Sequence, residues 1–175
     1  MENRFRDDSG YDCLLYVDGV DFKISGFNKC NFTPKFRASG LRWEVATSIK
    51  TGDICWIFGP FRCGEHNDLQ IFRMGLMDEL VEGEKVCADK IYGAEAPHKV
   101  KAPGTIFSRA QDAEMLKKVS KRHEHVNKRF KQWAILREEF RHNLGLHQNA
   151  FAAVAVMTQL CFEHGEPLAS VDYVE

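Results

Sequence analysis

The chain of 175 residues carries 24 Lys and Arg against 25 Asp and Glu, and 44% of its residues are hydrophobic. A chain of this size and composition buries a substantial core, which excludes a disordered tail and a small disulfide-stapled scaffold. The charge is unevenly placed, because residues 99–150 hold 12 basic and 5 acidic residues whereas residues 151–175 hold four acidic residues and no basic one. We take this basic block as the first indication of a charged interaction surface.

The six cysteines stand singly, without a Cys-x-x-Cys pair. This spacing favours neither a zinc site nor a redox motif, and we expect the thiols to stay reduced, as in an intracellular protein. No apolar run reaches the roughly 18 residues of a membrane-spanning helix, and no secretory leader opens the chain. We therefore expect no membrane contact.

Three apolar segments predict strands in the first third of the chain. Residues 13–17, 41–49 and 54–58 are rich in strand-forming residues, and a Thr-Gly-Asp turn at 51–53 separates the second from the third. The simplest arrangement is an antiparallel meander of these three strands. Residues 26–40 mix Gly, Asn, Pro and basic residues without periodicity, which predicts a loop.

A helix is predicted after this meander, because apolar residues recur three and four positions apart from Asn67-Asp68 to the turn at 82–84. Residues 85–88 predict a fourth strand that ends at Asp89, and residues 93–108 an irregular connection.

Two further helices are predicted in the second half, one from about Ser108 to about Arg141 and one over 150–162. The first is expected to bury Met115, Val119, Val126, Phe130, Trp133 and Leu136.

The order of elements predicts an α/β fold. A three-stranded antiparallel meander is followed by a helix, a strand that can pair in parallel, and two more helices, which together make a mixed sheet flanked by helices. This order is the outline of a ribonuclease H-like fold, and we expect residues 1–175 to form one such domain.

Two aspartates end predicted strands, Asp18 the first and Asp89 the fourth. If these strands are neighbours in the sheet, their carboxyl ends bring the two side chains close together. Adjacent carboxylates repel unless they are protonated or bridged by a cation, and Mg²⁺ or Mn²⁺ is the natural bridge.

Glu124 is the candidate third carboxylate. It is the one acidic residue in the run 117–131, where seven Lys and Arg surround it. A third ligand would complete a site for two metal ions roughly 3.5 to 4 Å apart, as in phosphoryl displacement. The alternative is a solvated helix in which Glu124 makes local ion pairs worth about 0.3 to 0.5 kcal/mol each.

Several motifs, taken together and in order, resemble the catalytic domain of DDE superfamily transposases of the PIF/Harbinger type. They are LYVDG at 15–19, SGLRWE at 39–44, TGDICWI at 51–57, GPFRCGEHND at 59–68, ADKIY at 88–92 and RHEHVNKRF at 122–130. The resemblance implies a ribonuclease H-like nuclease that binds divalent metal and cuts DNA. It also implies a nuclear location, a separate DNA-binding partner in place of the family's upstream helix-turn-helix, and a homo-oligomer as one arrangement.

Carried over residue by residue, Asp18 matches the family's first aspartate and Asp89 the aspartate of its A-D-x-x-Y motif. Asp68 matches a further recurrent aspartate, and we include it as a metal ligand, although it also suits a helix N-cap.

Two positions depart from the family pattern. Asn127 stands where we place the usual glutamate, with Glu124 one turn earlier on the same helix face, and Ile91 stands where the pattern has glycine. These departures leave open a second function: a decayed or domesticated copy that binds DNA or a protein without cutting.

The basic run supplies candidate phosphate contacts, which bind DNA without regard to its sequence. A plain solvated helix face is the alternative. The candidate DNA-binding residues are Lys117, Lys118, Lys121, Arg122, Lys128, Arg129 and Lys131.

Overall fold

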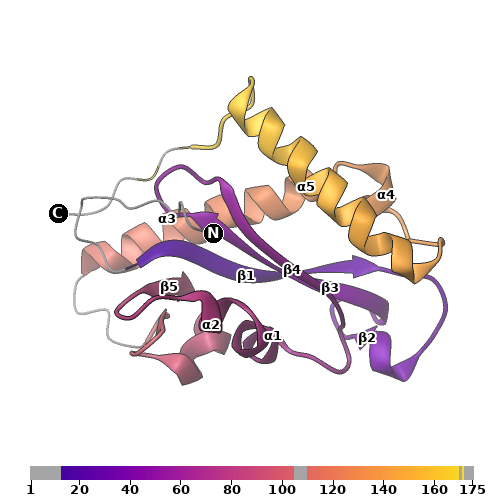
Figure 1. The fold of residues 1–175 in the computed structure, drawn as a ribbon, viewed down its shortest axis with the longest axis horizontal. Helices are drawn as coiled ribbons and strands as arrows, with labels where there is room; N and C mark the ends of the chain where they lie inside the picture. Colours follow the sequence, from indigo (N-terminus) through magenta and orange to yellow (C-terminus); the bar gives the residue numbers. More distant parts are fainter. Residues whose placement is uncertain (1–12, 105–109, 170, 172–175) are drawn as a thin grey trace.

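One mixed sheet forms the centre of the protein (Figure 1). The structure is a computed structural model that describes residues 13–104, 110–169 and 171. The long strands lie in the order β4, β3, β1, β5, with the short β6 beyond β5 and the short β2 beside the start of β3. The strands are β1 (Cys13–Lys23), β2 (Phe32–Thr33), β3 (Ala38–Ser48), β4 (Ile54–Arg62), β5 (Lys85–Ala88) and β6 (Val100–Lys101).

The strand directions confirm a meander joined to parallel strands. β1 pairs with β3 and β3 with β4 in antiparallel fashion, whereas β5 runs parallel to β1 and β6 parallel to β5. Of the described strands, β3 alone therefore runs against the others. The predicted mixed α/β architecture is confirmed at this level.

Helices cover both faces of the sheet. On one face lie α1 (Asp68–Met74) and α2 (Leu76–Glu79), drawn below the strands in Figure 1, and on the other lie α3 (Ala110–Phe130), α4 (Ala134–Arg137) and α5 (His147–Glu163). Three short 3₁₀ segments complete the connections, namely η1 (Lys29–Asn31), η2 (Lys90–Glu95) and η3 (Leu144–Leu146). No helix in the described part of the chain has the length and apolar content to cross a membrane.

The alternation of side chains along β1 divides the core between the two faces. Leu15 and Val17 pack with Phe72 of α1, whereas Tyr16 packs with α3, and Val20 with α3 and α5. This is the two-residue period of a strand that is buried on both faces. The same alternation determines the face of the sheet toward which each polar side chain of β1 points.

β1 is longer than predicted, because it continues past Asp18 to Lys23. The sequence predicts that this strand ends at Asp18, but Gly19 pairs with Glu44 of β3 and the ladder runs on to Lys23 and Gly40. Asp18 thus lies within a strand and does not end one.

The other predicted boundaries shift for local reasons. The helix after Asn67 is broken at Gly75, where a Cβ atom would lie 2.6 Å from the ring of Phe58, and the two short helices α1 and α2 result. The helix predicted to reach Arg141 ends at Phe130, and Trp133, predicted to be buried, precedes α4 and is 36% exposed. The predicted loop 26–40 also contains η1, β2 and the start of β3.

Candidate functional site

Asp18 and Asp89 lie side by side where β1 and β5 part. The parallel pairing of these strands extends to Val17 and Ala88, the residues immediately before the two aspartates. β5 ends there, while β1 continues along β3. The predicted proximity of Asp18 and Asp89 is therefore supported by the strand register, and alternation directs Asp18 toward the α3 face, as it does Tyr16 and Val20.

The carboxyl group of Asp18 is in an environment that disfavours its charge. Burial, with smaller contributions from the negative charges of Asp68 and Asp89, raises the pKa of Asp18 to about 7 against the opposing effect of Lys35. The backbone N–H of Gly19 donates to Oδ1 of Asp18 at 2.8 Å, which favours the ionised form but does not outweigh burial. A nearby cation would therefore strongly stabilise the ionised form of Asp18.

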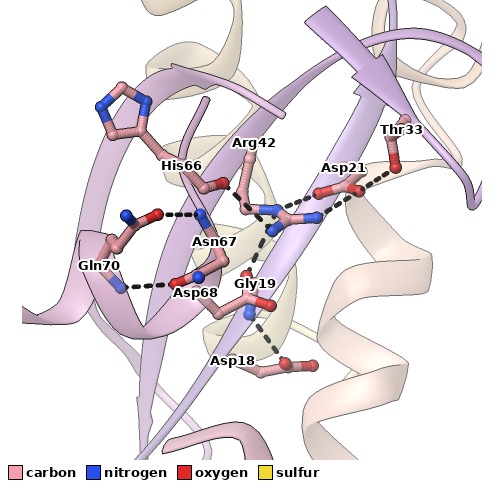
Figure 2. Close-up of polar contacts among 9 residues, drawn as sticks. All are labelled: Asp18, Gly19, Asp21, Thr33, Arg42, His66, Asn67, Asp68 and Gln70. Atoms are coloured by element: carbon pink, nitrogen blue, oxygen red, sulfur yellow. Dashed lines mark hydrogen bonds and ion pairs between the residues drawn. The ribbon is translucent and has the colours of Figure 1, made fainter. Parts of the chain in front are cut away.

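Asp68, in the first turn of α1, lies beside Gly19 on the face of β1 opposite to that of Asp18 (Figure 2). The N-cap of this helix is Asn67, whose side chain accepts from the backbone of Gln70 in a capping box, so the alternative of Asp68 as the cap is wrong. Oδ1 of Asp68 lies 3.3 Å from Nε of Arg42 and only 1.9 Å from the position that a Cβ atom on Gly19 would take. The absence of a side chain at Gly19 is what admits this carboxylate.

Arg42 holds a second aspartate, Asp21, which the sequence did not single out. Nε and Nη2 of Arg42 donate to the two carboxylate oxygens of Asp21 at 2.7 and 2.9 Å, and the hydroxyl of Thr33 donates to Asp21 at 3.2 Å (Figure 2). Burial acts to raise the pKa of Asp21, but the hydrogen bonds and charge of Arg42 outweigh it and hold the pKa below its usual value. A signal was available, because Asp21 and Arg42 each alternate with apolar residues that face the core on the other side.

Glu44 lies on the same face as Asp68, opposite Gly19 in the sheet register. It is 1% exposed; Oε1 accepts from the indole N–H of Trp56 at 3.0 Å, while Oε2 has no hydrogen-bond partner. Burial, together with the charge of Asp68, raises the pKa of Glu44 to about 8. Burial therefore favours the protonated form of Glu44 at neutral pH.

Glu124 and Asp89 line one pocket. The pocket has a volume of about 520 Å³ and lies between α3 and the end of β5. Tyr16, two positions before Asp18, belongs to the same pocket, and its ring lies 5.1 Å from that of His123 on α3. The structure thus places Glu124 on the side of α3 that shares a pocket with Asp89.

These carboxylates do not form a closed chelate in this conformation. Among residues 13–104, 110–169 and 171, no three His, Cys, Asp or Glu side chains are grouped closely enough to hold a metal ion. What the fold provides is a set of hard oxygen ligands on four segments, with Asp18, Asp89 and Glu124 toward α3 and Asp68 on the α1 side of β1. Burial is the main cause that raises the pKa of Asp18 and of Asp68, and neighbouring carboxylates add to it.

The basic run on α3 separates into residues that face solvent and residues that stabilise the fold. Lys117 and Lys121 line the pocket, and Lys118 and Lys128 are exposed. Arg129 forms an ion pair with Glu166.

The side chains of Arg122 and Lys131 contact other parts of the protein instead of extending freely into solvent. The Arg122 guanidinium is buried and donates to the carbonyl oxygens of Ser48, Ile49, Lys50 and Ala169. The predicted phosphate contact of Arg122 is therefore corrected to a structural role. The ammonium of Lys131 lies over the rings of Phe22 and Phe36, at 5.6 and 5.8 Å from their centroids.

Both departures from the family pattern have a place in the structure. Ile91 lies in η2, where its N–H donates to Oδ1 of Asp89 at 2.7 Å, and of the described non-glycine residues only Arg37 has a positive φ. The backbone at Ile91 thus has no need of glycine. Asn127 lies one turn after Glu124 on α3, and its side-chain oxygen is buried without a hydrogen-bond partner.

Neither a protein-family profile nor a curated protein matches this sequence. The functional interpretation consequently rests on the arrangement of Asp18, Asp68, Asp89 and Glu124 and on the pocket that Asp89 and Glu124 share.

Proposed function

We propose that this protein is a divalent-metal-dependent DNA nuclease of the DDE transposase type. Asp18, Asp89 and Glu124 would hold two Mg²⁺ or Mn²⁺ ions, with Asp68 as a further ligand. The observation that carries the proposal is the pairing of β1 with β5 up to Val17 and Ala88, which sets Asp18 beside Asp89. The pocket that Glu124 shares with Asp89 supports Glu124 as the third ligand.

A ribonuclease H-like fold is part of the proposal. Its outline is an antiparallel meander joined through a helix to a parallel strand, and the order β4, β3, β1, β5 fits that outline. In such a sheet the first strand and the strand after the helix are neighbours, which is the geometry that the carboxylates need.

The side chains of this chain supply binding and orientation. Asp18, Asp89 and Glu124 would hold the divalent ions, which would supply Lewis-acid activation of an attacking water or 3′-hydroxyl and charge stabilisation of the oxygen that leaves phosphorus. Lys117 and Lys121 lie on the same pocket wall as Glu124 and attract the phosphate backbone. Burial of Asp18 keeps its charge poorly hydrated, so that a bound cation is held against little competition from water.

The first test is Mn²⁺ binding measured by calorimetry. We expect the wild-type chain to bind Mn²⁺, and Asp18→Asn and Glu124→Gln each to weaken binding by more than about tenfold, because even groups that only orient a ligand contribute about 10- to 100-fold. Glu114→Gln is the matched control, since Glu114 lies on α3 with a largely exposed side chain paired with Lys118. Wild-type protein that binds no Mn²⁺, or an Asp18→Asn variant that binds it unchanged, contradicts the metal site.

The second test is cleavage of supercoiled and linear DNA with Mn²⁺, and with EDTA as the metal-free control. Asp18→Asn should lower the rate by about 100-fold or more, as loss of a group in direct contact with the reaction usually does. Cleavage that persists in EDTA, or that Asp18→Asn leaves intact, rules the mechanism out.

The alternative is a scaffold that binds DNA or a partner protein without cutting. It is favoured by one observation, the use of Asp89 Oδ1 to cap η2 through the N–H of Ile91. Salt-sensitive DNA binding is common to both functions, so only metal binding and cleavage separate them. Action on DNA in the nucleus belongs to this proposal as well.

A further inference from the structure

The pocket beside Asp89 has two chemically different parts. Its described walls combine apolar surface with two basic and two acidic groups. A pocket of about 520 Å³ is within the range of about 300 to 1,000 Å³ that accommodates one small molecule. The lining residues are Tyr16, Ala88, Asp89, Pro103, Gly104, Ala113, Leu116, Lys117, Ser120, Lys121 and Glu124.

One stripe of α3 forms a whole wall of this pocket. The six α3 residues recur at spacings of three and one, so they share one helix face, and from Ala113 to Glu124 they extend over about 16 Å. Along this stripe the chain passes from Ala113 and Leu116 through Lys117 and Lys121 to Glu124. The apolar part of the wall is therefore continuous with the acidic residues of the candidate nuclease site.

The chemistry of the walls specifies the ligand. Pro103 and Ala113, both exposed, offer apolar contact to a flat, uncharged body, and Lys117 and Lys121 offer ammonium groups to an anion. A nucleobase with its phosphate has both parts. A base stacked inside a duplex cannot reach a pocket of this kind, because it must first leave the stack.

We propose that this pocket binds one unstacked nucleotide of a DNA strand, next to the phosphodiester that is cut. The position of the cut bond rests on the proposed function, whereas binding of the nucleotide does not depend on cleavage. The base lies against the apolar end of the α3 stripe, and the phosphate meets Lys117 and Lys121.

Ala113 is the position at which the pocket can be filled with least disturbance of the core. It is exposed and lies on the pocket wall, so Ala113→Trp adds a large side chain to the space that the base would occupy. Glu114→Trp is the matched control, since it adds the same side chain to the same helix at a position that is exposed and outside the pocket lining.

The experiment measures binding of oligonucleotides that contain 2-aminopurine, in Ca²⁺ or EDTA so that no cutting occurs. An unstacked 2-aminopurine fluoresces more strongly than a stacked one. We expect the wild type and Glu114→Trp to raise the fluorescence of a gapped duplex and to bind it at least tenfold more tightly than a fully paired duplex. Ala113→Trp should lose both effects. Thymidine monophosphate, tested alone by calorimetry, separates a pocket that takes a free nucleotide from one that needs the rest of the strand.

Two readouts separate this inference from the proposed function. Mn²⁺ binding should be the same in Ala113→Trp and in the wild type, which also shows that the variant is folded. If Ala113→Trp binds gapped DNA as the wild type does while Mn²⁺ binding is intact, the nucleotide pocket is overturned and the metal site stands. If gapped DNA binding is lost in Ala113→Trp and no variant or wild type binds Mn²⁺, the pocket stands and the nuclease fails. Equal loss in Glu114→Trp also overturns the pocket.

Discussion

Asp18 and Asp21 are the same residue type, three positions apart in one strand, and their pKa values move in opposite directions. Asp21 is 1% exposed, yet its pKa lies below the usual value. Asp18 is somewhat more exposed, yet its pKa is raised to about 7. Strand alternation explains the contrast, since it directs Asp21 to the face that carries Arg42 and Asp18 to the face of α3.

The difference shows that burial alone does not mark a functional carboxylate. Asp21 is buried together with a forked guanidinium and the hydroxyl of Thr33, which satisfy its oxygens. Asp18 is buried near two other carboxylates, Asp68 and Asp89, so its ionised form is unfavourable in the folded protein. A carboxylate whose charge is unfavourable in the folded protein marks a candidate cation-binding site.

Loss of the Asp21 carboxylate should have the largest effect on stability. Asp21→Asn removes the charge that the largely buried Arg42 guanidinium pairs with most closely and leaves Asp68 as its remaining carboxylate, which should cost about 3 kcal/mol of unfolding free energy at pH 7. Urea unfolding followed by circular dichroism measures it, with Asp78→Asn, at an exposed position of α2, as the control.

The sign of the pH dependence follows from the lowered pKa of Asp21. Its stabilisation is complete above the unfolded pKa of about 3.9 and is lost as the pH falls through the lower folded value. The gap between wild type and Asp21→Asn should therefore narrow in acid. A gap that widens in acid would mean that Arg42 does not stabilise the charged form.

Arg42→Lys should have the next largest effect. A lysine keeps the positive charge but cannot donate in parallel to both oxygens of Asp21 while facing Asp68, so we expect a loss of about 1 to 3 kcal/mol. Arg62→Lys is the control, because Arg62 is exposed and makes only a surface ion pair with Glu65. Equal stability of Arg42→Lys and wild type would show that charge alone is sufficient at this position.

The proximity of Asp18 and Asp89 could be predicted from the sequence, and the reason is local. Each aspartate directly follows a short apolar segment, and a helix between these segments permits parallel pairing, which the register Val17 with Ala88 bears out. The length of β1 was not predictable in the same way. Asp18-Gly19 is a common turn signal, and only the pairing with β3 reveals that the strand continues.

The partners of the charged residues could not be predicted, because they come from distant segments. Arg122 stands in a basic run, but the carbonyl oxygens that bury it belong to residues 48–50 and 169. Asp21 and Arg42 are 21 positions apart in the sequence, and only the register between β1 and β3 brings them together. Sequence spacing specifies which residues share a helix face, and it contains no information on what packs against that face.

Asp18→Asn should stabilise the metal-free protein, in contrast to Asp21→Asn. Because the folded pKa of Asp18 is raised, the proton is bound more tightly in the folded state, and stability is lost as the pH rises from about 3.9 toward about 7. Replacing the carboxyl with an amide removes this loss, so we expect a gain of roughly 1 to 2 kcal/mol at pH 8 in EDTA and none at pH 4. Thermal unfolding at the two pH values measures it, and destabilisation at pH 8 contradicts the environment assigned to Asp18.

Gly19→Ala should have the smallest effect on stability. It tests whether Asp68 occupies the space beside Gly19, next to Asp18. The added methyl would lie 1.9 Å from Oδ1 of Asp68, so the flexible carboxylate must turn away from β1 and from Arg42. We expect a loss of about 1 kcal/mol, within the usual range for an overfilled site. In Gly19→Ala/Asp68→Ala the clash is absent, so the double variant should be more stable than the sum of the two single effects predicts. Strict additivity would show that Asp68 does not occupy the space above Gly19 in solution.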